Sequence, residues 1–129
     1  MNTALTISIL PERLAVCRLS PDAALDHAAL SGNLWSITRT ADELSLVLPE
    51  ENVQPGWLSE GGWRALKVLG PLDFSLVGIL SQLSGTLAAA GVSLFALSTY
   101  DTDYILVKET DLATSVRALK SIGCRLTGG

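Results

Sequence analysis

RALKVLGPLDFSLVGILSQLSGTLAAAG, residues 64–91, has the clearest secondary-structure pattern in the chain. It opens with a β-rich run at 64–69, and the break GPLD then leads into a segment whose leucines recur at helical spacing until Gly91. Such spacing places the leucines on one face of a helix, and a glycine is a common stop signal. The stretch is therefore predicted to form one strand followed by one amphipathic helix.

The residues that follow complete the pattern. Two β-rich runs, at 92–99 and 104–108, are separated by the polar cluster 100–103, which suits a hairpin connection. Helical spacing returns at 111–123, and CRL at 124–126 begins a last strand. The predicted order is βαββαβ, the ferredoxin-like plan, an α+β fold in which two helices cover one face of an antiparallel sheet.

The first part of the chain is less regular. LTISIL and LAVCRL are predicted as two strands joined at Pro11-Glu12-Arg13, and Ser20-Pro21-Asp22 is predicted to start a short helix that runs to Leu30. Two more strands, LWSIT and LSLVL, follow after Gly32. The sequence thus predicts strands here with a weaker helical signal than in the second part.

An internal repeat relates the two parts. LWSITRTADELSLVLPE, from Leu34, aligns without a gap with LFALSTYDTDYILVKE, from Leu94. Chance similarity between two amphipathic hairpins is the alternative. The connector 50–62 contains Pro55 and three glycines, so we predict two halves, 1–62 and 63–129.

Composition limits the possible partners. The 129 residues are 48% hydrophobic and 17% charged, with a net charge of −4 and scattered Lys and Arg, so neither nucleic acid nor a membrane is an expected partner. No apolar stretch approaches the ~20 residues of a membrane helix, and the start of the chain lacks signal-peptide features. We expect a cytoplasmic protein in which Cys17 and Cys124 are buried reduced thiols.

The strings TRTADELSLVLPE, GWRALKV, GPLDFSLVGIL and VSLFALSTYDTDYILVKETDLATSVRAL carry a resemblance over nearly the whole chain. The chain resembles small bacterial proteins with tandem ACT-like domains, and it is similar to the ACT modules of CASTOR-type cytosolic arginine sensors and of aspartate kinase regulatory domains. The resemblance implies two ferredoxin-like subdomains, each with antiparallel strands and helices on one face. It also implies a regulatory domain that binds an amino acid between modules and has no catalytic residues. The sensors contain four modules where this chain has about two, so a complete pocket requires a second copy and the ligand need not be arginine.

The resemblance also assigns candidate ligand-binding residues. It places Asp103 against the positive charge of the ligand and Tyr100 along the pocket, and it makes GPLDFS the loop that meets the ligand carboxylate. A helix start offers unpaired N–H groups for such a carboxylate. The full candidate set is Leu72, Asp73, Phe74, Ser75, Ser98, Thr99, Tyr100 and Asp103. From the residues alone, Asp73 or Ser75 could be a helix N-cap, Asp101 and Asp103 could be turn formers, and Ser98 and Thr99 could be ordinary strand-end residues.

Little in the sequence favours catalysis. His27 is the only histidine, no nucleophile motif accompanies it, and there is neither zinc-ligand spacing nor a phosphate-binding glycine loop. We therefore expect no enzyme activity, no metal and no cofactor. The first hypothesis is a homodimeric sensor of a small molecule, an amino acid or a similar zwitterion. The alternative is a structural dimerisation or protein-interaction module that binds no ligand.

Overall fold

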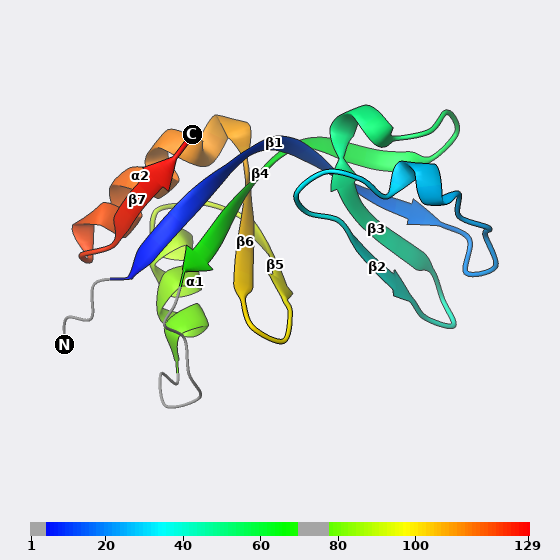
Figure 1. Ribbon diagram of the computed structural model, residues 1–129. Helices are drawn as coiled ribbons and strands as arrows, with labels where there is room; N and C mark the ends of the chain where they lie inside the picture. Colours follow the sequence, from blue (N-terminus) through cyan, green and yellow to red (C-terminus); the bar gives the residue numbers. More distant parts are fainter. Residues whose placement is uncertain (1–4, 70–77) are drawn as a thin grey trace. The chain divides into compact units, whose positions relative to one another are not determined.

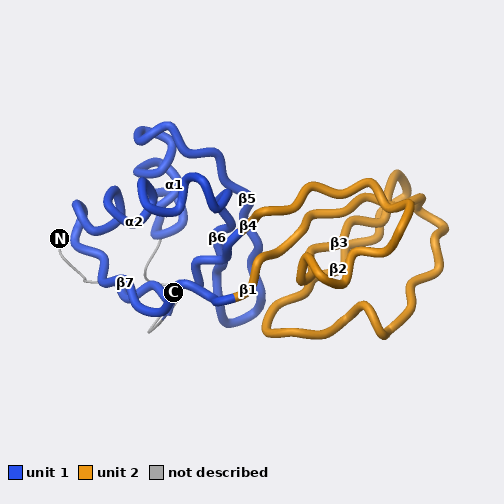
Figure 2. Tube along the Cα trace, turned by 90° about the horizontal axis from the view of Figure 1, so that it is seen from above, with its two compact units in different colours: residues 1–11, 64–129 blue, residues 12–63 orange. Residues whose placement is uncertain are grey.

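The computed structural model describes residues 5–69 and 78–129 of the chain (Figure 1). The residues group into two compact units, shown in different colours in Figure 2. The C-terminal unit comprises Met1–Pro11 and Arg64–Gly129, and the N-terminal unit comprises Glu12–Trp63. The sequence predicted a division between residues 62 and 63, whereas here the start of the chain groups with the C-terminal unit.

The C-terminal unit has the βαββαβ order predicted for it. Its elements are β4 (Leu58–Leu69, of which the residues from Arg64 on belong to this unit), α1 (Ile79–Ala89), β5 (Leu94–Ser98), β6 (Asp103–Lys108), the 3-10 helix η3 (Glu109–Asp111), α2 (Leu112–Ser121) and β7 (Arg125–Gly128). Helices α1 and α2 contact each other (Figure 1). The chain therefore has an α+β fold.

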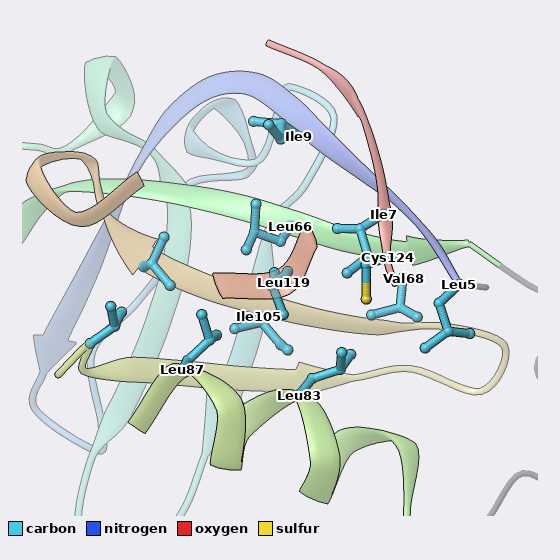
Figure 3. Close-up of a cluster of buried hydrophobic side chains, with 12 residues drawn as sticks. Leu5, Ile7, Ile9, Leu66, Val68, Leu83, Leu87, Ile105, Leu119 and Cys124 are labelled. Carbon is cyan, nitrogen blue, oxygen red and sulfur yellow. The ribbon is translucent and has the colours of Figure 1, made fainter. Parts of the chain in front are cut away.

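The core of the C-terminal unit lies between its strands and both helices. Leu83 and Leu87 of α1 and Leu119 of α2 are fully buried (Figure 3). They pack in one cluster with Ile105 and Val107, which alternate along β6 and so share one face of the sheet. Both helices therefore cover the same sheet face, as the ferredoxin-like plan requires.

Strand β1 (Thr6–Leu19) is a single strand, so the prediction of two strands separated at Pro11 was wrong. Thr6–Ile9 pair with β7 and Leu14–Leu19 pair with β3, and Pro11 lies between these two stretches. Its missing N–H therefore costs no hydrogen bond in either ladder. The β1–β7 pairing is parallel, which corrects the prediction of purely antiparallel sheets.

The strands pair in the order β2-β3-β1-β4-β6-β5, with β7 also beside β1. The pairs β1–β3, β2–β3 and β5–β6 are antiparallel. Strands β2 (Ser36–Arg39) and β5 are the two ends of this order among the described residues.

The N-terminal unit is built from strands without a covering α-helix. Besides its parts of β1 and β4 it contains β2, β3 (Leu44–Pro49) and the 3-10 helices η1 (His27–Ala29) and η2 (Glu50–Asn52). Its core includes Ala15, Cys17, Ala29, Leu44, Leu46 and Leu48. The unit, Glu12–Trp63, lies wholly within the described residues and contains no α-helix.

The helix predicted from Ser20 to Leu30 is therefore wrong, and Arg39 gives the reason. Its guanidinium donates hydrogen bonds to the carbonyl oxygens of Pro21 and Ala23, the latter at 2.9 Å. An α-helix over these residues would use the same carbonyls for its own hydrogen bonds. Only the single turn η1 forms, capped by Asp26, whose Oδ1 accepts from the backbone N–H of Ala28 at 2.9 Å.

Gly61 and Gly62, which the sequence predicts as part of a connector, lie inside β4. The backbone N–H of Gly62 donates to Glu50 Oε2 at 2.6 Å, and a side chain at Gly61 would clash with the same carboxylate. Arg13 Nε lies 3.5 Å from Glu50 Oε1. The two glycines thus let a carboxylate rest against the strand backbone.

Candidate functional site

The described part of the candidate site is the tip of the β5–β6 hairpin. Ser98 pairs with Asp103, and the four residues 99–102 connect the strands. The backbone N–H of Thr99 donates to the carbonyl oxygen of Thr102 at 2.8 Å, and Thr99 Oγ1 accepts from the N–H of Thr102 at 3.2 Å. These bonds fix the turn and place Ser98, Thr99, Tyr100 and Asp103 together.

Ser98 and Asp103 are in direct contact. Ser98 Oγ donates to Asp103 Oδ1 at 2.7 Å, and Asp103 is partly buried at the start of β6. A carboxylate has about four lone-pair sites, so this one bond leaves capacity to accept from a ligand ammonium or guanidinium. The pair can therefore act as an anionic acceptor whose orientation is fixed.

Tyr100 lies at the tip of the hairpin and is 94% exposed. Within a single copy of the chain, its ring is in solvent and does not line a pocket formed by the described residues. A role in ligand contact would need the ring to be covered by another molecule.

The other half of the predicted site lies outside the described residues: Leu72, Asp73, Phe74 and Ser75. Helix α1 starts at Ile79, later than the predicted start near Asp73–Ser75. Its N-cap is Gly78, with φ of 88°, and no side chain among the described residues caps the helix. Asp73 and Ser75, the alternative N-caps, lie outside the described residues.

The hairpin of the N-terminal unit has the same turn. Thr40 N donates to the carbonyl oxygen of Glu43 at 2.9 Å, and Thr40 Oγ1 accepts from the backbone N–H groups of Asp42 and Glu43, each at 3.1 Å. Thr40 thus occupies the place that Thr99 has in the other hairpin.

This equivalence corrects the register of the predicted repeat. Arg39 pairs with Leu44 as Ser98 pairs with Asp103, so Leu46 corresponds to Ile105 and not to Leu106. A shift of one residue moves every side chain to the other face of a strand. Leu46 and Ile105 are both core residues of their units, which agrees with the corrected register.

One charged residue that the sequence did not single out is built into the C-terminal unit. Arg64 is only 8% exposed, and its Nη2 donates to the carbonyl oxygens of Leu10 at 3.0 Å and Gly129 at 2.8 Å. Its Nη1 lies 3.7 Å from Glu109 Oε1. The sequence offered no signal for this role, because β4 also contains the charged residues Glu60 and Lys67. Because these contacts link β1, the residue after β7 and η3, we assign Arg64 a structural role.

The described residues contain no group of three or more His, Cys, Asp or Glu side chains placed to hold a metal ion. Cys17 and Cys124 are both buried and free, as predicted, and burial raises the pKa of each thiol above its ordinary value of 9.0. A raised pKa keeps a thiol protonated and poorly nucleophilic.

Comparison with known proteins shows which family part of the chain matches. The ACT domain family profile matches residues 58–121, which run from β4 to the end of α2. A crystal structure, Protein Atu0741 from Agobacterium tumefaciens, is 31% identical, with 98% of this chain and 95% of that chain covered and a TM-score of 0.92. Residues 58–121 therefore belong to the ACT domain family. A separate profile, described as an N-terminal domain, matches residues 12–56.

Other relatives of this ACT domain protein include regulatory proteins. The human cytosolic arginine sensor for mTORC1 subunit 1 is 37% identical over 59 residues, which cover 45% of this chain and 18% of the sensor. The matched part therefore spans less than a fifth of the length of that relative. The regulatory subunit of aspartate kinase from Thermus thermophilus shares the fold, with a TM-score of 0.67 at 9% identity over 93% of this chain and 99% of that one.

In the described part of the ACT domain protein, no helix is long and apolar enough to cross a membrane.

Proposed function

We propose that this ACT domain protein is a regulatory module that binds a small molecule, in the first place a free amino acid, through ACT–ACT interfaces of a homodimer. The observation that carries the proposal is the family match over residues 58–121, together with the similarity to an arginine sensor. In this proposal the protein is cytoplasmic and is not an enzyme.

The hairpin tip supports this proposal chemically. An amino acid presents an ammonium group and a carboxylate, so its receptor needs a fixed anion beside hydrogen-bond donors. Asp103, oriented by Ser98 at 2.7 Å, is our candidate for the anion. We propose Thr99 and Tyr100 as neighbouring contacts, with Leu72, Asp73, Phe74 and Ser75 on the carboxylate side of the ligand.

We propose that the N-terminal unit is a second ACT-like half of the protein. Its support is the β2–β3 hairpin, whose Thr40 turn has the same hydrogen bonds as the Thr99 turn of β5–β6. Because this unit has no α-helix, it would contribute strands to an interface and would not repeat the helix-covered layer.

A thermal-shift screen against the common amino acids tests the function. A ligand present at 100 times its Kd stabilises the folded state by about 2.7 kcal/mol, which raises Tm by about 10 °C for a domain of this size. We expect at least one amino acid to give such a shift. If none does, the amino-acid proposal fails.

Asp103→Ala locates the site, with Asp101→Ala as its matched control in the same turn. We expect Asp103→Ala to weaken binding by about 2 kcal/mol or more, because a charge partner of the ligand is lost. Asp101→Ala should leave affinity within about 0.5 kcal/mol, as ordinary surface substitutions do. Equal losses in the two variants would remove Asp103 from the site.

A ligand-free interaction module is the second candidate. It is favoured by the Thr40 turn, because the same hydrogen bonds form in a hairpin to which no ligand is assigned. This candidate predicts a stable dimer whose Tm does not respond to any amino acid.

A further inference from the structure

Strand β7 is the least firmly attached strand of the C-terminal unit. Among the described residues it pairs with β1 alone. Three of its four residues are exposed, and Leu126 is the one that packs against the apolar cluster of the unit. By contrast, Ile105 and Val107 of β6 are fully buried, and β6 lies between β4 and β5. An element with so few buried contacts opens locally at a lower free energy than the core around it.

The pairing of β7 is short and flanked by glycines. It is a parallel ladder of four residues, and parallel pairing is slightly less stable per residue than antiparallel pairing. The ladder starts where the backbone N–H of Arg125 donates to the carbonyl oxygen of Leu5 at 2.8 Å. Gly123 lies just before the ladder, and Gly128 and Gly129 end it. Glycine loses the most conformational entropy when it is fixed, so ordering this segment is costly.

The guanidinium of Arg64 fastens the far end of β7. Its Nη2 donates to the carbonyl oxygens of Leu10 at 3.0 Å and Gly129 at 2.8 Å, the residues that directly follow the paired stretches of β1 and β7. The Nε of this buried side chain has no hydrogen-bond partner among the described residues. The two carbonyls therefore replace much of the hydration that the charge lost on burial, and hydrogen bonds from a charged donor are stronger than neutral ones.

We infer that β7 is a releasable strap, which opens while the rest of the C-terminal unit stays folded and which the Arg64 guanidinium holds closed. Cys124 directly precedes the strap and is 9% exposed, in the same apolar cluster as Ile7 of β1 (Figure 3). Release of the strap uncovers this thiol and the edge of β1. The inference goes beyond the proposed function, because opening of the strap needs no ligand.

Alkylation of the intact chain by iodoacetamide, with each cysteine quantified separately by peptide mass spectrometry, tests the inference. Only an accessible thiolate reacts, so a buried cysteine is labelled at a rate set by the population of its open form. Cys17 lies in the core of the N-terminal unit and is the internal reference. We expect Cys124 to be labelled at least about ten times faster than Cys17, because a four-residue strap opens at a lower free energy than a core strand.

Arg64→Met and Lys67→Met are a matched pair on β4. Both remove a positive charge, but alternation along the strand puts Lys67 on the face opposite to Arg64. Arg64→Met should speed the labelling of Cys124 by about ten- to a hundredfold, the factor that a hydrogen bond to a charged group contributes. Lys67→Met should change this rate by less than about twofold, as substitutions without specific contacts do. Neither variant should speed the labelling of Cys17.

Gly128→Ala acts on the strap itself, and it tests the inference even if Arg64→Met fails to fold. An added Cβ would lie 2.5 Å from the carbonyl oxygen of Ile9, so this variant should also speed the labelling of Cys124. Hydrogen exchange measured by mass spectrometry reports on the rest of the unit. In the folded variants the amides of β6 should stay protected, whereas those of β7 should exchange faster with Arg64→Met and Gly128→Ala.

Three outcomes would overturn the inference. The first is labelling of Cys124 in the unsubstituted protein that is no faster than labelling of Cys17. The second is acceleration at Cys124 that is matched by loss of protection in β6, because the whole unit would then be unfolding. The third is equal acceleration by Lys67→Met and Arg64→Met, which would remove Arg64 as the clamp. None of these measurements involves an amino acid, so their failure would leave the proposed function standing.

Discussion

Gly128 of β7 lies so close to the backbone of β1 that a side chain at this position would clash. Its φ is 82°, and an added Cβ would lie 2.5 Å from the carbonyl oxygen of Ile9. Gly91 has a similar φ of 81°, but an added Cβ there would meet nothing within 4 Å. An alanine at Gly91 would therefore introduce backbone strain alone, whereas an alanine at Gly128 would introduce backbone strain together with a steric clash.

We expect Gly128→Ala to lower the free energy of unfolding by about 2–4 kcal/mol, because it combines a positive φ with a backbone clash. Gly91→Ala should lose only about 1 kcal/mol, the cost of the dihedral. Urea unfolding monitored by circular dichroism measures both. Equal losses would mean that the β1–β7 contact is looser than described.

The buried thiols of Cys17 and Cys124 predict a pH dependence of stability. Burial raises the pKa of each thiol above 9.0, so the folded state holds its protons more tightly than the unfolded state. The resulting stabilisation is complete below about pH 9 and is lost as the pH rises through the folded-state pKa. We expect the free energy of unfolding to fall less steeply above pH 9 in a Cys17→Ala, Cys124→Ala double variant. The same slope in both proteins would contradict this account.

The two hairpin turns allow a prediction at the scale of elements. Thr40 and Thr99 make equivalent hydroxyl contacts, so Thr40→Ala and Thr99→Ala should each lower the free energy of unfolding by about 1 kcal/mol. Chemical denaturation of the two variants measures this. If Thr99 also contacts the ligand, Thr99→Ala alone should weaken amino-acid binding. A stability loss at Thr40 only would show that the turns are not equivalent.

The elements that the sequence predicted well are those whose pattern is local. The strands and helices from β4 to β7 follow from leucine spacing, β-rich runs and glycine stops, all of which are read within a few residues. The predictions were wrong where contacts between residues distant in the sequence determine the local structure. Arg39 takes the carbonyls of Pro21 and Ala23 that a helix would need, and Pro11 is tolerated because β1 changes neighbours there.

The candidate site was predictable only in part for the same reason. Tyr100 and Asp103 are candidates because of the resemblance to the arginine sensors, whereas the bond between Ser98 and Asp103 depends on the hairpin register. Arg64 could not be assigned in advance, because its acceptors on Leu10 and Gly129 are distant in sequence.

At the scale of the whole molecule, two features support regulation by a ligand. The family match covers β4 to α2, and the hairpin tip offers an oriented carboxylate at Asp103. Binding at or near an interface between copies couples ligand occupancy to association by mass action. Such coupling would let a small chain act as a regulator.

Isothermal titration calorimetry of the intact chain with single amino acids, beginning with arginine, is the most direct measurement. We expect a saturable heat of binding for at least one amino acid, at a fixed ratio of ligand to chain, that is greatly weakened in Asp103→Ala and kept in Asp101→Ala. Absence of heat with every amino acid, from protein shown to be folded in the same buffer, would contradict the proposal that the chain binds an amino acid.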